Sequence, residues 1–545
     1  MLSVLKKISV LKTYRFYLWL ILMMQVAVLI YWGSQKSNYY WDEFFTFDNA
    51  HYYASTTPER VKLDNSDLFQ EDTWMPVKDL KATYLVTKES SVLNDSFLHN
   101  VKRFFSYKPY MLLLNVNETI FFEGKMSKWG GISLNIIFFL VSQVFLYILV
   151  NKLIQNEKAA LLSVIMYGFC GMAISMVEFV RMYVFISFLI IIVTYFHYEM
   201  WESQIWWKDI LLEVFSVIVI YLAYLNSLLV ALYAAGLIFC FSAGLLIQKR
   251  YKQLLIYFVP ITCSAVAYLW FKTNFIRELL QPQKYLKGLP TDSVEYNGLQ
   301  QMLNFSLEEL KMRIKSLYDI FVRLLFGNNV ILWGWIALII VLLIIYANKR
   351  KNGDLTKIQW DHQKSFSAIM FGTVILFMVL MIYTGAGLSR YYSLIFPEVS
   401  ALCVIVAWDL GRIIGKSKLI EKLVSFLIIF SAIITFCIPQ IENLYLDDKD
   451  TITILQEYKV DSVLINCNVL ANINDCIAWV DEDSRIYVYR GEYLQCEGFP
   501  DEFMLWVGNK QEIDDQTKSI LQESGYTLIS KLGGTYLSDI YLCER

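Results

Sequence analysis

The chain has 545 residues, of which 56% are hydrophobic and 18% are charged, and its mean hydropathy is +0.43. Soluble domains contain roughly 45–50% apolar residues, so this composition excludes an ordinary soluble protein and indicates an integral membrane protein. The formal net charge of −2 does not supply the basic face that nucleic acid requires, and we predict no nucleic-acid partner.

Long apolar runs recur along the sequence, each close to the roughly 20 residues that a helix needs to cross a bilayer. They predict a mainly α-helical, polytopic membrane protein with about eleven spanning helices. The predicted spans cover about 16–32, 132–151, 159–177, 183–199, 210–226, 228–247, 253–271, 327–347, 366–386, 392–410 and 418–438.

Lysine and arginine residues orient these spans by the positive-inside rule. Lys6, Lys7, Lys12 and Arg15 precede the first span, which predicts a cytoplasmic N-terminus. Basic residues in every second connection fall on the same side, so we predict a multi-pass cell-membrane protein with an extracytoplasmic C-terminus. These residues are Lys152, Lys158, Lys208, Lys249, Arg250, Lys252, Lys349, Arg350, Lys351, Arg412, Lys416, Lys418 and Lys422.

This orientation places the loops at about 33–131 and 272–319 outside the cytoplasm. The first span is followed by YWGSQKSN, which offers no small-x-small cleavage site, so we interpret it as a retained anchor rather than a signal peptide. SVLNDSFLHNVKRFF, at 91–105, is typical of a helix lying in the membrane interface. Ser306 and Glu309 form a capping-box pattern that opens SLEELKMRIKSLYDIF. We therefore expect extracytoplasmic juxtamembrane helices.

Residues 441–545 predict a small extracytoplasmic α/β domain, after a transmembrane module at 1–440. DSVLINC, RIYVYR, FMLWVG, TLISKL and DIYLC are typical of strands, and IDDQTKSILQES predicts an amphipathic helix. Four cysteines, an even number, in an oxidising compartment predict two disulfides, and four cysteines allow three different pairings. Unpaired buried thiols are the alternative prediction. These cysteines are Cys467, Cys476, Cys496 and Cys543.

The first predicted external loop begins with NYYWDEFFTFDNAHYY, which places Asp42, Glu43 and Asp48 among aromatic residues just beyond the first span. The longest cytoplasmic segment, at about 348–364, is too short to form a fold that holds a nucleotide. A sugar donor would therefore come from outside or from a lipid carrier. A merely solvated loop is the alternative interpretation of the three acids.

Four segments carry a family resemblance: WDEFFT at 41–46, SKWGGISLNIIFF at 127–139, FVRMY at 179–183 and SRYYSLIFP at 389–397. Together they resemble the GT-C glycosyltransferases that use polyprenyl-phosphate sugars, which include the protein O-mannosyltransferases and the lipid A aminoarabinose transferases. The resemblance covers about 16–410. It implies a GT-C bundle that moves a hexosyl or pentosyl group, with inversion, from a polyprenyl-phosphate donor in the membrane lipid to an extracytoplasmic glycan, lipid or protein hydroxyl.

The family's chemistry implies that Asp42 is the general base that takes the proton from the attacking hydroxyl. Nearby acids and aromatic rings make such a carboxylate a better base. Glu43 is the second catalytic candidate. Glu43 and Asp48 would raise the pKa of Asp42 or hold a cation.

The leaving group is a lipid phosphate, which the two parallel donors of an arginine guanidinium can bind. Arg390 matches the family's Arg-Tyr motif. Arg181 is the second candidate, and an ion pair with Glu178, three residues away on one helical face, is its alternative role. The other substrate-binding candidates are Tyr391, Tyr183, Asp48 and Lys108, although the two tyrosines are equally typical of interfacial aromatic residues.

One segment departs from the family. Bacterial relatives commonly carry Asp-x-His-Pro-Pro in the second half of this loop, whereas FFSYKPYMLLLN, at 104–115, keeps only Pro109. Asp95 or His99 would have to substitute for the missing groups. The C-terminal tail contains no metal-ligand cluster and the first loop lacks this element, so we predict no metal site; the cofactor is unknown and a divalent cation is left open.

The rival hypothesis is a transporter or flippase of lipid-linked sugars without catalysis, or a degenerate GT-C protein. Transporters usually place ionisable groups near the membrane midplane. Glu398, roughly 12 Å along the helix from Arg390, is the exception among spans that are otherwise almost free of charge.

Overall fold

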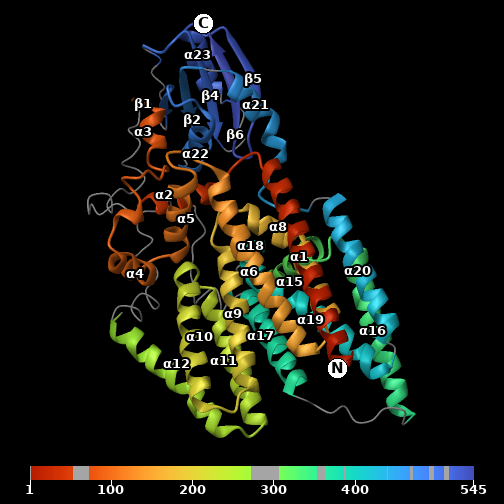
Figure 1. Cartoon of the computed structure of the whole chain (residues 1–545). Helices are drawn as coiled ribbons and strands as arrows, with labels where there is room; N and C mark the ends of the chain where they lie inside the picture. Colours follow the sequence, from red (N-terminus) through yellow and green to blue (C-terminus); the bar gives the residue numbers. More distant parts are fainter. Residues whose placement is uncertain are drawn as a thin grey trace. The chain divides into compact units, whose positions relative to one another are not determined.

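The computed structural model describes residues 2–52, 73–271, 306–352, 362–385, 387–415, 417–437, 440–458, 460–466, 470–489, 496, 498–508, 513 and 515–545. Its residues divide into two compact units. Unit 1 comprises Met1–Val28, Ile136–Val177 and Met182–Ile441, and unit 2 comprises Leu29–Asn135, Glu178–Arg181 and Glu442–Arg545. Figure 1 shows the helices and strands along the chain.

Unit 1 is built from long apolar helices. Within the described residues, nine helices are long and apolar enough to span a membrane, or ten if the bent pair of α7 and α8 forms one span. The chain is therefore a multi-pass membrane protein, as predicted, although the predicted number of eleven spans is not confirmed. The helices that contribute to unit 1 are α1 (Leu2–Gln35), α6 (Lys128–Ile154), α7 (Glu157–Gly168), α8 (Gly171–Glu178), α9 (Tyr183–Glu202), α10 (Trp206–Asn226), α11 (Val230–Ile247), α12 (Tyr251–Phe271), α15 (Leu307–Leu324), α16 (Asn329–Lys351), α17 (His362–Thr384), α18 (Ser389–Tyr392), α19 (Phe396–Ile414) and α20 (Ser417–Cys437).

Two local predictions can be followed in unit 1. The expected capping box is present at the start of α15, where the Ser306 hydroxyl accepts from the Glu309 amide and the Glu309 carboxylate accepts from the Ser306 amide. The predicted span at 253–271 coincides with α12, which is not among the nine helices above.

A glycine allows α7 to pack closely against α1. A Cβ atom at Gly168 would lie 1.8 Å from Nε2 of Gln25, so no other residue fits there without displacement. The same Gln25 side chain is buried and donates to the carbonyl of Val164 at 3.1 Å. The chain then bends by 55° between α7 and α8.

Unit 2 contains a six-stranded mixed sheet in the order β1-β3-β2-β4-β6-β5. The five strands predicted in the C-terminal tail are confirmed: β2 runs parallel to β3 and β4, and β6 runs antiparallel to β4 and β5. The sixth strand comes from the first predicted external loop and pairs antiparallel with β3. The strands are β1 (Trp74–Pro76), β2 (Ser462–Asn466), β3 (Arg485–Tyr489), β4 (Glu502–Gly508), β5 (Leu528–Gly534) and β6 (Ser538–Glu544).

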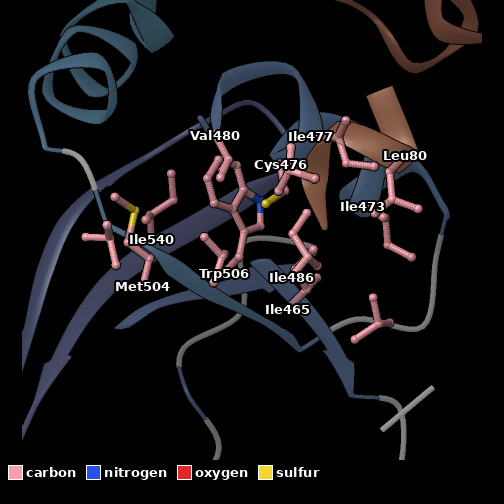
Figure 2. Packing of buried hydrophobic residues seen from close by; sticks show 14 of the residues in the cluster. Leu80, Ile465, Ile473, Cys476, Ile477, Val480, Ile486, Met504, Trp506 and Ile540 are labelled. Atoms are coloured by element: carbon pink, nitrogen blue, oxygen red, sulfur yellow. The ribbon is translucent and has the colours of Figure 1, made fainter. Parts of the chain in front are cut away.

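Alternating side chains of this sheet fill two separate hydrophobic clusters. On β4, Met504 and Trp506 point into the first cluster, shown in Figure 2, and Leu505 points into the second. Helices α3 (Val77–Lys81), α21 (Lys449–Glu457) and α22 (Leu470–Trp479) contribute to the first cluster, and α23 (Asp515–Glu523), the predicted amphipathic helix, contributes to the second.

This two-sided core corrects the prediction of two disulfides. Cys496 and Cys543 are free, buried thiols, Cys476 is also buried, and Cys467 lies outside the described residues. Cys476 belongs to the first cluster, whereas Cys496 and Cys543 belong to the second, so the sheet separates Cys476 from the other two. The alternative prediction, buried thiols that pack as small hydrophobic groups, describes Cys496 and Cys543.

The first-loop part of unit 2 is also helical, with α2 (Trp41–Tyr52), α4 (Phe97–Ser106) and α5 (Pro109–Phe121). The predicted helix in SVLNDSFLHNVKRFF corresponds to α4, which is capped by the Ser96 hydroxyl. None of its residues is buried, and Phe97 and Leu98 are 79% and 78% exposed. Such an apolar face is typical of a helix that rests on a membrane surface, which stays a prediction for α4.

Candidate functional site

The two adjacent carboxylates of the first loop begin α2, but they lie in different surroundings. Both fall in the first turn, where the helix dipole favours negative charge. Asp42 is 8% exposed, whereas Glu43 is fully buried. Neighbours in sequence point about 100° apart around a helix, so the structure gives the two carboxylates different contacts.

Glu43 is held by three donors from two chain segments of unit 2. Its Oε2 accepts from Lys36 Nζ at 3.0 Å and from the Tyr40 amide at 2.6 Å, and its Oε1 accepts from the Val180 amide at 2.6 Å. Lys36 also donates to the carbonyl of Asn443 at 2.9 Å. This buried ion pair therefore joins α2 to segment 178–181 and to the start of the C-terminal tail.

Arg181 is anchored to the same helix by one nitrogen. Its Nη1 donates to the main-chain carbonyl of Asp42 at 2.9 Å and to the Thr46 hydroxyl at 3.0 Å. Its Nε is buried and, within the described part of the chain, has no hydrogen-bond partner. The guanidinium thus keeps donor capacity beyond the two bonds that fix it.

The alternative role proposed for Arg181, an ion pair with Glu178, is wrong. Both carboxylate oxygens of Glu178 are buried without a hydrogen-bond partner among the described residues. Glu178 packs instead against Gly33, where a Cβ atom would lie 2.8 Å from its Oε2.

Lys108 completes the group around Asp42. It is half-buried at the N-cap of α5, and its ammonium makes no ion pair or hydrogen bond with another described residue. Burial lowers the pKa of Lys108, the Arg181 charge lowers it further, and the Asp42 charge acts in the opposite direction. One carboxylate and two cations therefore influence one another in this part of unit 2, and a bound anion would relieve the repulsion between the cations.

Three other first-loop candidates, Asp48, Asp95 and His99, lie in other surroundings. Asp48 is six residues beyond Asp42 on α2; burial, and then the Asp48 charge, raise the pKa of the Tyr84 hydroxyl. Asp95 forms an ion pair with Arg103 at 2.5 Å, and His99 is exposed on α4.

The other predicted substrate-binding residues belong to unit 1. The Arg390 guanidinium lies 5.5 Å from the ring centroid of Tyr391, and the rings of Tyr391 and Tyr183 are 6.3 Å apart. Arg390 and Tyr391 are on α18, and Tyr183 begins α9. Tyr183 is thus brought next to Arg390 and Tyr391, a neighbouring pair that lies far from it in sequence.

Sequence reasoning missed Glu118, on α5 in unit 2. Its side chain is 2% exposed, its Oε1 has no partner among the described residues, and burial raises its pKa to about 8. A Cβ at Gly130 would fall 1.6 Å from Glu118 Oε1, and a Cβ at Gly131 would fall 2.0 Å from Val180. The glycine pair in SKWGG was the available signal, because two adjacent glycines at a helix start permit such close approach.

No group of three or more His, Cys, Asp or Glu side chains that could hold a metal ion occurs in the part of the chain that the structure describes. Asp42, Arg181 and Lys108 offer a single carboxylate and two cations, which is a poor donor set for a divalent cation and a good one for a phosphate.

Comparisons with known proteins show the fold. The aminoarabinose transferase ArnT from Cupriavidus metallidurans, bound to undecaprenyl phosphate, matches with a TM-score of 0.53 and 9% identity over 95% of this chain and 97% of the ArnT chain. The apo form of ArnT matches over the same shares with a TM-score of 0.51 and 9% identity. The oligosaccharyltransferase of Archaeoglobus fulgidus gives a TM-score of 0.37 and 10% identity over 78% of this chain and 61% of its own.

No protein-family model matches the sequence, and no curated protein matches it. The likeness to ArnT over almost the full length of both chains shows that this multi-pass membrane protein has the GT-C glycosyltransferase fold, with a small sheet domain at its C-terminus.

Proposed function

We propose that this protein transfers a sugar from a polyprenyl-phosphate donor to an acceptor hydroxyl on the extracytoplasmic side, with inversion at the anomeric carbon. The observation that carries the proposal is the grouping of Asp42 with Arg181 and Lys108 in a chain with the GT-C fold. The ArnT structure that shares this fold holds undecaprenyl phosphate, which supports the lipid class of the donor.

Asp42 is the general base in this mechanism. The acceptor oxygen attacks the anomeric carbon, its proton passes to a carboxylate oxygen of Asp42, and the bond between that carbon and the phosphate oxygen breaks. The lipid phosphate leaves with the electron pair. A positioned carboxylate of this kind typically contributes about 10²–10⁴-fold to a rate.

Arg181 and Lys108 bind the phosphate that leaves. The developing negative charge on the phosphate oxygens is stabilised by cations that are already in place and only partly hydrated. Arg181 is fixed by its bonds to the Asp42 carbonyl and to Thr46, so its guanidinium does not have to reorganise during the reaction.

Glu43 acts as a positioning residue rather than as a second base. Its carboxylate already accepts from Lys36, Tyr40 and Val180 and is fully buried. By holding the Val180 amide, it keeps Arg181, the next residue, beside α2. Arg390, Tyr391 and Tyr183 are proposed donor contacts on the strength of the family resemblance alone, and we assign no substrate role to Asp48.

The test is transfer from a defined polyprenyl-phosphate sugar by purified protein in detergent, with donor binding followed separately. We expect Asp42→Asn to bind the donor and to lose transfer. The opposite outcome is a wild-type protein that binds the donor, transfers no sugar to any acceptor and moves the intact donor between the leaflets of a liposome. That result would contradict catalysis and identify a flippase.

A further inference from the structure

Unit 1 contains a line of buried polar groups that the proposed transfer reaction does not use. These groups lie between helices α9, α10, α11, α12 and α19, inside segments that are otherwise apolar. The sequence drew attention only to Glu398; the structure adds Glu213 and His197, which are 2% and 1% exposed. Ionisable residues inside a membrane bundle are costly and usually functional.

The first part of the line surrounds Glu398 on α19, whose side chain is fully buried. The Tyr233 hydroxyl of α11 donates to its Oε1 at 2.5 Å, and the Thr194 hydroxyl of α9 donates to the same oxygen. Thr194 and Tyr233 are themselves 2.8 Å apart. The other oxygen, Oε2, is buried with no partner in the described part of the chain.

The second part surrounds Glu213 on α10. His197 of α9 donates from Nδ1 to the Val193 carbonyl at 2.9 Å, so Nε2 of the neutral ring can accept from the Tyr257 hydroxyl of α12 at 3.2 Å. Glu213 Oε2 lies 3.9 Å from the same Nε2 and, among the described residues, has no hydrogen-bond partner.

These two parts follow each other along α9. Thr194 and His197 are three residues apart, on one helical face and roughly 4.5 Å apart along the axis. One turn before Glu213, Asp209 accepts from Gln253 of α12 at 3.2 Å, and its other carboxylate oxygen is buried with no hydrogen-bond partner among the described residues. The line therefore runs from Asp209, near one end of α10, through Glu213 to Glu398.

The ligand that these groups suit is a proton. Apart from the weak contact of Glu213 with His197, no basic side chain of the described residues pairs with Glu213 or Glu398, and an uncompensated buried carboxylate costs several kcal/mol. Each carboxyl group is thus neutral in this arrangement. A metal ion would need three or more such side chains that converge on one point, and no such group occurs among the described residues.

We propose that unit 1 contains a proton-binding relay in which Glu213 and Glu398 each hold a proton and exchange it with water through the Asp209 end. The groups that face Glu213 are His197 and Tyr257, and those that face Glu398 are Thr194 and Tyr233. The proposal is independent of the transfer reaction. The relay would place proton-binding carboxyl groups, Glu213 and Glu398, in the membrane part of the protein.

The test is infrared spectroscopy of the purified full-length protein at about pH 6, where most exposed carboxyl groups are already ionised. We expect a carbonyl band of protonated carboxylic acids that loses one component in Glu213→Gln and another in Glu398→Gln. Tyr233→Phe should shift the Glu398 component to higher frequency without removing it, because one donor to that carboxyl group is lost. Exchange into D2O should shift both components.

Glu202→Gln is the matched control, because Glu202 is an exposed glutamate at the end of α9 and should leave the band unchanged. Thermal unfolding in detergent identifies any variant that has lost its fold. If neither Gln variant alters the carbonyl band, Glu213 and Glu398 do not hold the proposed protons. If the two components never shift in D2O, these protons do not exchange with water and there is no relay.

Discussion

Lys36 Nζ and Glu43 Oε2 lie 3.0 Å apart, and both side chains are fully buried. Glu43 is adjacent to Asp42 in sequence, so this ion pair fixes the helix that carries the proposed base. Because the pair also reaches Val180 and Asn443, it connects three chain segments of unit 2 through one carboxylate and one ammonium.

Replacing the proposed base should remove transfer without harming the fold. Asp42→Asn keeps the shape of the side chain, and we expect transfer to fall by about 10²–10⁴ while donor binding changes little. Asp79→Asn is the matched control, since Asp79 is exposed on α3 in the same unit. An Asp42→Asn protein that turns over at the wild-type rate would refute the assignment.

Removing one member of the buried ion pair should destabilise unit 2. Glu43→Gln leaves Lys36 charged and without its carboxylate, which typically costs about 3–5 kcal/mol. The double variant Lys36→Met, Glu43→Gln should recover part of this loss, because it removes the unpaired charge, although the single amide oxygen of Gln can accept from only one of the Tyr40 and Val180 amides. Thermal unfolding and the transfer rate per folded molecule distinguish a positioning role of Glu43 from a catalytic one. If Glu43 were catalytic, Glu43→Gln would have a normal melting temperature and no transfer activity.

The two cations should affect the donor differently. Arg181→Lys cannot reproduce both the bonds to α2 and the two-pronged contact with phosphate, so we expect transfer to fall on the order of 10–10²-fold. Lys108→Met should mainly weaken donor binding, by about tenfold, or about 1.4 kcal/mol. Lys102→Met, an exposed lysine of the same loop, is the control. Equal donor affinity in all four proteins would contradict the phosphate site.

Glu118 should make unit 2 less stable as the pH rises. Its pKa of about 8 lies above the roughly 4.3 of an unfolded glutamate, so the folded chain binds the proton more tightly. Stability from this group is fully present below about pH 4.3 and is lost as the pH rises towards 8. Glu118→Gln should therefore raise the melting temperature near pH 9, by at least about 2–4 °C, and not near pH 4.

The measurement is the melting temperature of the full-length protein in detergent against pH, with Glu482→Gln, an exposed glutamate of unit 2, as the control. Parallel curves for wild type and Glu118→Gln would show that the carboxyl group does not change its ionisation on folding.

The predicted orientation can be tested without an activity assay. A tag placed after Arg545 should react with a membrane-impermeant reagent on intact cells, because the positive-inside rule places the C-terminus outside. A tag in the segment at about 348–364 should be protected. The reverse pattern would put the site of unit 2 in the cytoplasm and exclude the proposed acceptors.

The sequence by itself determined the features that depend on local patterns. A bilayer demands about 20 apolar residues per helix, and a strand between two clusters alternates its side chains, so most spans and the strands β2 to β6 could be predicted. The capping box at Ser306 could be predicted as well, because it involves contacts only three residues apart.

Only the tertiary structure distinguished the proposed role of Asp42 from that of Glu43. Their different contacts depend on Lys36, Val180 and Arg181, which lie outside α2. The same holds for β1, which leaves the first loop to pair with β3 across about 400 residues of sequence, and for Cys476, which the sheet separates from Cys543. Glu213 lies inside the predicted span at 210–226, but only the structure shows which groups surround it. Its partner His197 lies on another helix, and burial without a cation is a property of the packed bundle.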